Sequence, residues 1–173
     1  EDYWYDVKPC IRIIPAEKTE FTCLWYGWDD FAQGGINEAG LFFDGAVTPE
    51  QPKIGGYLSP KGNLGDEILA NCKTVEDAIE FIERRKVALT NAHMLFGDST
   101  GNAAVIEWIE GEQRLIPIAG NYLIATNYLP GDTLKVNYPC YRMTAMENEL
   151  NRLEEINVPT GLKEGGNILA KAT

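Results

Sequence analysis

The sequence predicts an α+β domain in which β-strands and helices form segregated layers. Strand patterns occupy residues 10–47, two helical segments follow within residues 66–85, further strand patterns span residues 93–127, and a helical pattern begins near residue 141. This order argues against alternating βαβ units and against a doubly wound nucleotide-binding fold. A chain of 173 residues has the size of one domain, so we expect residues 1–173 to form a single domain.

The first strands are predicted from "CIRIIPA" and "EFTCLWYGW", which form a hairpin around the charged turn at residues 17–19. In "QGGINEAGLFFDG" we expect Gly34, Gly35 and Gly40 to supply turns and close backbone approach. The following run, "AGLFFDGAV", is typical of a central strand that is covered on both faces. Residues 48–64, rich in proline and Gly-Gly steps, are predicted to form a loop beside a pocket.

Two helices are predicted next. Thr74 is expected to cap "VEDAIEFIERR", with Asp77 completing a capping box, and Asp66 is expected to cap the shorter "GDEILANC". Strands "HMLFGD", "AAVIEW", "QRLIPI" and "NYLIATN" then form an antiparallel meander. A final amphipathic helix, "YRMTAMENELNRLEEI", is expected to cover the sheet and to break at Pro159.

Composition excludes several classes of function. The net charge of -11 disfavours nucleic acid and anionic membranes as partners, and no apolar stretch approaches the roughly 20 residues that cross a bilayer. The four cysteines are scattered without a CxxC pair and there is one histidine, so we expect free thiols and no metal. No phosphate-cradling glycine loop indicates a nucleotide, so we expect no cofactor. The compartment stays open, with a slight preference for the cytoplasm.

Several residues are catalytic candidates on their own chemistry. His93 stands near no GxSxG motif, and the adjacent acids Asp29 and Asp30 point apart on a strand end, so structural and surface roles are favoured. The aromatic residues near Trp4 and Trp25 suit an acyl group or sugar and equally suit a core margin. Asn127 places a side-chain amide where an apolar run meets a Pro-Gly loop, a position that fits an oxyanion donor or a turn cap.

Taken in order, "QGGINEAGLFFDG", "TVEDAIEFIERR", "HMLFGDSTGNAAVIEW" and "LIATN" resemble the choloylglycine hydrolase and penicillin V acylase family, together with the related acyl-CoA:6-aminopenicillanic acid acyltransferases. The resemblance spans most of the chain. It implies an N-terminal nucleophile (Ntn) hydrolase with an αββα sandwich of antiparallel sheets, which cleaves linear amide bonds. It also implies a small-molecule N-acyl amide as substrate and assembly as a homo-oligomer.

The resemblance assigns roles to particular residues. Asp2 matches the aspartate that holds the nucleophile, Asn127 after Thr126 matches an oxyanion donor, and Arg142 matches an arginine beside the nucleophile. At the position of the family's second oxyanion donor this chain has Val47, which lacks a side-chain donor, so the substrate subclass is expected to differ. The residues expected to bind substrate are Trp4, Trp25, Phe43 and Val47.

A departure from the family concerns the nucleophile. Ntn chemistry uses a cysteine at the start of the chain, whose own α-amine acts as base, and Glu1 cannot fill that role. Neither Cys10 nor Cys23 follows a recognisable processing site. We therefore expect a sandwich that is incomplete at both ends, without the cysteine-bearing hairpin. Three hypotheses remain: a cysteine amidohydrolase, an acyltransferase of the same fold, and a non-catalytic domain that binds a small ligand.

Overall fold

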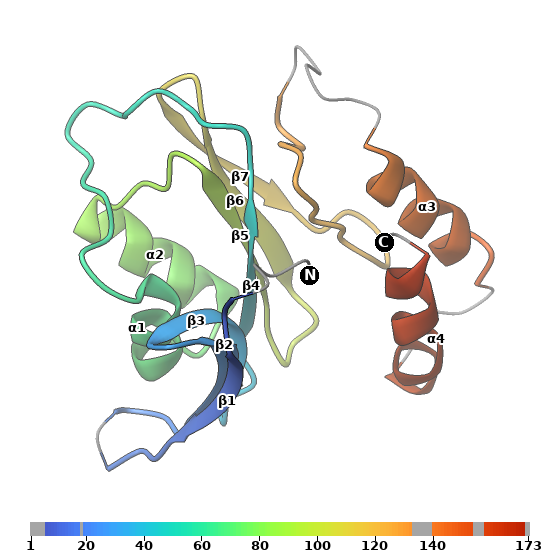
Figure 1. Cartoon of the computed structure of the whole chain (residues 1–173), viewed down its shortest axis with the longest axis horizontal. Helices are drawn as coiled ribbons and strands as arrows, with labels where there is room; N and C mark the ends of the chain where they lie inside the picture. Colours follow the sequence, from blue (N-terminus) through green and yellow to red (C-terminus); the bar gives the residue numbers. More distant parts are fainter. Residues whose placement is uncertain (1–5, 18, 133–139, 154–157, 172–173) are drawn as a thin grey trace.

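The computed structural model of the chain contains a seven-stranded antiparallel sheet whose strands lie in sequence order (Figure 1). The structure describes residues 6–17, 19–132, 140–153 and 158–171. The strands are β1 (Pro9–Ile14), β2 (Cys23–Trp28), β3 (Phe31–Asn37), β4 (Phe42–Val47), β5 (Ala92–Gly97), β6 (Ala103–Ile109) and β7 (Glu112–Pro117). The helices are α1 (Leu64–Asn71), α2 (Val75–Arg85), α3 (Tyr141–Leu150) and α4 (Val158–Ala170).

The predicted hairpin of β1 and β2 is confirmed, but the glycine-rich stretch after it is largely a strand. Gly34 and Gly35 lie inside β3 and do not form a turn. A Cβ at Gly34 would stand 2.2 Å from the Tyr26 hydroxyl, and one at Gly35 would stand 2.6 Å from the Leu24 carbonyl oxygen. The predicted close approach is therefore correct for these two glycines. Gly40, with φ of 93°, supplies the turn into β4.

Strand β4 occupies the centre of the sheet, as predicted, between β3 and β5. One face of this sheet carries α1 and α2 (Figure 1). Helix α2 begins with the predicted capping box of Thr74 and Asp77. Helix α1 starts earlier than expected: Asn63, rather than Asp66, is the N-cap, because its side chain accepts the Asp66 N–H.

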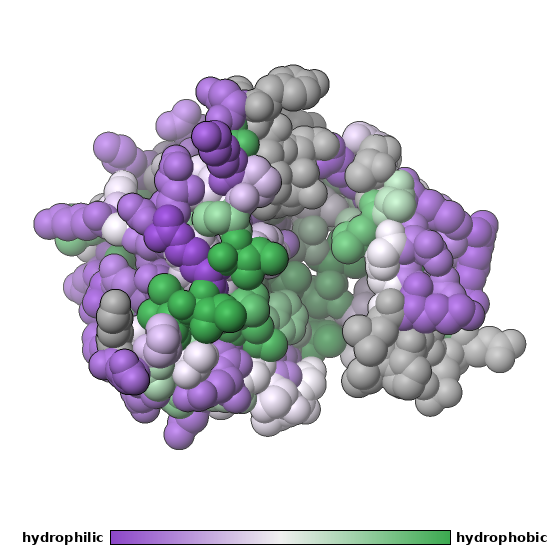
Figure 2. Space-filling view, turned by 60° about the horizontal axis from the view of Figure 1, so that its bottom comes forward, coloured by the Kyte–Doolittle hydropathy of each residue, from purple (hydrophilic) through white to green (hydrophobic). Residues whose placement is uncertain are grey.

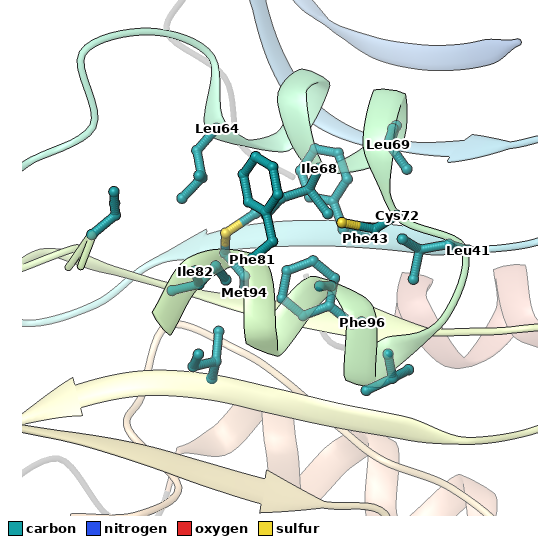
Figure 3. Packing of buried hydrophobic residues seen from close by; sticks show 14 of the residues in the cluster. Leu41, Phe43, Leu64, Ile68, Leu69, Cys72, Phe81, Ile82, Met94 and Phe96 are labelled. Carbon is teal, nitrogen blue, oxygen red and sulfur yellow. The ribbon is translucent and has the colours of Figure 1, made fainter. Parts of the chain in front are cut away.

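The hydrophobic core lies between the sheet and these two helices. Phe43 of β4 and Phe96 of β5 are 3% and 0% exposed, with ring centroids 6.4 Å apart. Ile68 of α1 and Ile82 of α2 pack over them (Figure 3). This packing orders the strands that carry the candidate site on the other side of the sheet.

The face of the sheet that points away from α1 and α2 is apolar over β1 to β4. Phe42 is 39% exposed while its neighbour Phe43 is buried, since successive side chains of a strand point to opposite faces. The prediction that this strand is covered on both faces is therefore wrong for the described residues. Figure 2 shows a hydrophobic area on this side of the molecule. It comprises Ile11, Ile13, Leu24, Tyr26, Ile36 and Phe42.

The remaining strands form the predicted meander of β5, β6 and β7, but the fourth predicted strand is absent. Residues 119–130 adopt no strand in the structure. Their apolar side chains are partly or fully buried: Leu123 and Ile124 are half-buried, and Tyr128 and Leu129 are 8% and 4% exposed. An apolar pattern indicates burial, and here burial is reached without a β-ladder.

Helices α3 and α4 pair beyond the face of the sheet opposite α1 and α2 (Figure 1). Pro159 does not end a helix as predicted; it is the second residue of α4, where its missing N–H would have had no intrahelical partner. The α+β class with an antiparallel sheet is confirmed. The predicted αββα sandwich has two sheets, and the described residues form one of them. Among the helices of the described residues, none has the length and apolarity that a membrane crossing requires.

Candidate functional site

The candidate site is a hydrogen-bonded cluster around Asn127, on the side of the sheet away from α1 and α2. The Asn127 side chain is exposed, and its Nδ2 donates to the carbonyl oxygen of Val47 at 2.9 Å. Its Oδ1 accepts from Nη1 of Arg142 at 2.8 Å. A side-chain amide carries two N–H hydrogens, so the bond to Val47 uses one of them and orients the other. The structure thus brings together Asn127, Arg142 and Val47, three of the residues singled out from the sequence.

Val47 contributes to this cluster through its backbone. Its side chain is 67% exposed at the end of β4, and its carbonyl oxygen accepts the Asn127 amide. The side chain supplies no donor, as the sequence predicted. The carbonyl, which every amino acid carries, anchors the residue that does have a donor.

A thiol adjoins the cluster. Cys140 Sγ lies 3.3 Å from Oγ1 of Thr126, the residue that precedes Asn127. Partial burial opposes ionisation of this thiol, but hydrogen bonds from Thr126 and from the backbone N–H groups of Met143 and Arg142, with the Arg142 charge, lower its pKa below the usual value. A lowered pKa increases the fraction of reactive thiolate at neutral pH.

Sequence reasoning did not select Cys140. Its only local signal is the position just before α3, where N–H groups at a helix start can stabilise an anion, and that signal depends on knowing where the helix begins. Contact with Thr126, fourteen residues earlier, follows from the folded chain alone.

The other cysteines differ in environment. Burial raises the pKa of Cys23 to about 11 and that of Cys72 to about 12. Both lie in the core between the sheet and the helices, so they serve packing and are poor nucleophiles at neutral pH. Cys10 is half-buried on the edge strand β1. All four cysteines are free thiols.

Two of the other predicted site residues lie away from this cluster. Trp25 and Phe43 are 2% and 3% exposed and belong to the core on the helix side of the sheet. The structure therefore places these two rings on the face opposite Asn127. Asp2 and Trp4 lie outside the described residues, and their assigned roles stay predictions.

The residues given structural roles from the sequence are placed as follows. His93 is fully buried in β5, with Nδ1 3.7 Å from Oε2 of Glu107. Asp30 forms an ion pair with Arg12 at 2.6 Å and is highly exposed, as befits a surface acid. Among the described residues, no group of three or more His, Cys, Asp or Glu side chains is placed to hold a metal ion.

Comparison with known proteins adds a family and a fold. The sequence model of the family described as acyl-coenzyme A:6-aminopenicillanic acid acyl-transferase matches residues 32–157. No curated protein matches the sequence.

Among solved structures, penicillin V acylase from Agrobacterium tumefaciens superposes with a TM-score of 0.67 at 18% identity, over 90% of this chain and 56% of that one. A variant of a conjugated bile acid hydrolase from Clostridium perfringens superposes with a TM-score of 0.57 at 21% identity, over 91% of this chain and 53% of that one. A second variant of that hydrolase gives a TM-score of 0.54 at 20% identity, over 90% and 53%. The chain thus spans about half the length of these structures and shares their fold.

Proposed function

The chain belongs to the acyl-coenzyme A:6-aminopenicillanic acid acyl-transferase family, and from this premise we propose that it forms part of a hydrolase of linear amide bonds. The observation that carries the proposal is the Asn127 amide, held between the Val47 carbonyl and the Arg142 guanidinium. An amide oriented in this way is suited to stabilise the oxyanion that forms when an acyl group is attacked.

The proposed reaction follows the chemistry of cysteine acyl transfer. A base takes the proton of a cysteine thiol, the thiolate attacks the carbonyl carbon of an N-acyl amide, and the second Nδ2 hydrogen of Asn127 donates to the developing oxyanion. The C–N bond then breaks, and the departing amine takes the proton that the base had accepted. Water finally attacks the thioester and releases the carboxylic acid and the free thiol. Asp2 is proposed to orient the α-amine that acts as this base.

Arg142 has two proposed roles in this scheme. Its Nη1 binds Asn127 Oδ1, which directs Nδ2 away from the guanidinium and toward the reacting carbonyl. Its positive charge also suits a carboxylate on the substrate. The apolar face that includes Phe42 and Tyr26 is proposed to receive the acyl chain, since β4 runs from Phe42 to Val47 at the Asn127 cluster.

The test is turnover by the intact enzyme on a panel of N-acyl amides that includes penicillin V and a conjugated bile acid, the compounds for which the similar structures are named. Asn127→Ala should lower kcat by about a hundredfold, the typical effect of losing one oxyanion donor. Asn121→Ala, at an exposed position six residues earlier, is the matched control and should not change kcat. Unchanged turnover in Asn127→Ala would refute the proposed role.

The nucleophile is identified by labelling with a thiol-reactive acyl analogue and mapping the modified peptide. Labelling of an N-terminal cysteine of the active enzyme supports the Ntn mechanism, whereas labelling of Cys140 assigns attack to the thiol beside Thr126. Saturable ligand binding with neither labelling nor turnover would support a non-catalytic binding domain. Transfer of the acyl group to an added amine in preference to water would support an acyltransferase. Assembly as a homo-oligomer is a further prediction, which light scattering tests.

A further inference from the structure

The segment that carries Asn127 needs an anchor that the β-ladder does not supply. Residues 119–130 adopt no strand, although they stand directly after β7 in the chain. Tyr128 and Leu129 are buried, and Asp132 N–H donates to the Leu129 carbonyl at 3.0 Å. Apolar burial is non-directional, so it holds the segment close to the sheet without setting its position along the surface.

Two charged side chains of the sheet hold the peptide groups on either side of Gly131. Glu107 of β6 accepts the Gly131 N–H with Oε1 at 2.6 Å. Arg114 of β7 donates through Nη1 to the Gly131 carbonyl oxygen. Glu107 and Arg114 are direct partners in the β6–β7 ladder, so neighbouring strands hold both backbone polar groups of one residue.

The glycine at position 131 permits this close approach. A Cβ there would stand 2.3 Å from Oε1 of Glu107 and 3.4 Å from Cδ of Arg114. A side chain at this position would displace either the backbone or the buried Glu107 carboxylate, and both displacements break the hydrogen bond between them. The geometry therefore couples the identity of Gly131 to the presence of Glu107.

Glu107 is fully buried and lies next to the buried side chain of His93 on the neighbouring strand β5. The Nδ1 of His93 lies 3.7 Å from Oε2 of Glu107, and both side chains are 0% exposed. Within the described structure, Oε2 and both imidazole nitrogens have no hydrogen-bond partner. A buried ionic or polar pair of this kind is weak evidence for stability, because well-packed apolar side chains of similar volume are often at least as stable. A role in positioning explains its presence better than a role in stability.

We propose that Glu107, supported by His93 and Arg114, is a positioning residue that clamps Gly131 and thereby places Asn127 at the Val47 carbonyl. The inference rests on the proposed function of Asn127. Asn127 is four residues from the clamp and donates to Val47 of β4, so the segment is held to the sheet at both points. Release of the clamp frees one end of the segment and lets the amide depart from its oriented position.

Three variants test the proposal by peptide-resolved hydrogen exchange over residues 126–132, alongside kcat and KM. Glu107→Leu removes the acceptor oxygen and should speed exchange in this segment about tenfold, as expected for loss of a charge-assisted hydrogen bond. Glu107→Gln retains an acceptor oxygen and should show a smaller increase. Gly131→Ala leaves both charged side chains in place and should loosen the segment through the clash of its Cβ.

The matched controls are Glu112→Gln, an exposed carboxylate on β7, and Gly55→Ala, a loop glycine with no atom within 4 Å of an added Cβ. Both should exchange and turn over like the native protein. For the clamp variants, kcat should fall with exchange in β6 unchanged, whereas general destabilisation would raise exchange throughout the sheet.

Native-like exchange over residues 126–132 in both Glu107→Leu and Gly131→Ala would overturn the inference. If Glu107→Leu does not fold, Gly131→Ala and Glu107→Gln decide. The exchange readout is independent of catalysis: faster exchange in the clamp variants, combined with full activity in Asn127→Ala, would support the clamp and refute the proposed function. Native exchange combined with an inactive Asn127→Ala would do the reverse.

Discussion

Asn37 at the end of β3 should be among the residues whose loss destabilises the fold most. Its side chain is 4% exposed and makes three hydrogen bonds to the backbone. Oδ1 accepts the Leu41 N–H at 3.0 Å, while Nδ2 donates to the carbonyl oxygens of Leu69 at 2.8 Å and Cys72 at 2.6 Å. One amide thus closes the β3–β4 turn and satisfies carbonyls at the end of α1, where helical partners run out.

The magnitude follows from the groups that Asn37→Ala leaves behind. Each buried polar group without a partner costs about 1–3 kcal/mol, so three such groups should lower the free energy of unfolding by about 3–5 kcal/mol after partial relaxation. This is a large share of the roughly 5–15 kcal/mol that stabilises a typical domain. Asn37→Asp retains the acceptor for the Leu41 N–H but sets an oxygen against two carbonyl oxygens, so it should destabilise at least as much.

Urea unfolding followed by tryptophan fluorescence measures these differences, since the chain has four tryptophans. Asn121→Ala, which removes the same amide from an exposed position, is the control and should change the free energy of unfolding by less than about 0.5 kcal/mol. A loss of less than about 1 kcal/mol in Asn37→Ala would refute the reasoning, because water would then have replaced the three bonds.

Two further predictions concern ionisable groups. Partial burial opposes ionisation of Asp98, but hydrogen bonds from Thr100 and the Val75 N–H lower its pKa. The native protein should therefore be more stable than Asp98→Asn at pH values above the carboxyl pKa of the unfolded chain. This difference in the free energy of unfolding should shrink as the pH falls through the lowered pKa of Asp98 in the folded protein. Urea midpoints between pH 3 and 7 test the direction, and a difference independent of pH would contradict it. Because its pKa is lowered, the Cys140 thiol should react with iodoacetamide at pH 7.5 before the Cys23 thiol does. Peptide mass spectrometry measures the order of modification, and the reverse order would contradict the assigned environments.

The elements predicted correctly are those whose cause is local. The capping box of Thr74 and Asp77 depends on residues three apart, so helix α2 was readable from the sequence. Strand β3 was missed because glycine is depleted in strands. Gly34 is a glycine because the Tyr26 hydroxyl of the neighbouring strand would meet its Cβ at 2.2 Å. Such a reason exists only once the strands are paired.

The same distinction between local and long-range causes applies to the candidate site. Asn127 was singled out by its place in the sequence and by the family resemblance, and Arg142 by the resemblance alone. The structure places Nη1 of Arg142 2.8 Å from Oδ1 of Asn127. Cys140 and Glu107 were missed, since their partners, Thr126 and Gly131, lie 14 and 24 residues away. Trp25 and Phe43 were selected for their aromatic chemistry, but alternation along their strands sends both rings to the helix side.

The departure at Val47 can now be separated into two effects. The Asn127 amide binds the backbone carbonyl of residue 47, so the identity of that side chain does not determine whether the amide is held. The side chain itself is 67% exposed, but it stands four residues after Phe43 in β4, so alternation directs it to the helix side of the sheet. A hydroxyl or amide in place of the valine side chain would therefore point away from the face that carries Asn127. The orientation of Asn127 is set by the Val47 carbonyl and Arg142, and the lack of a side-chain donor at position 47 does not alter it.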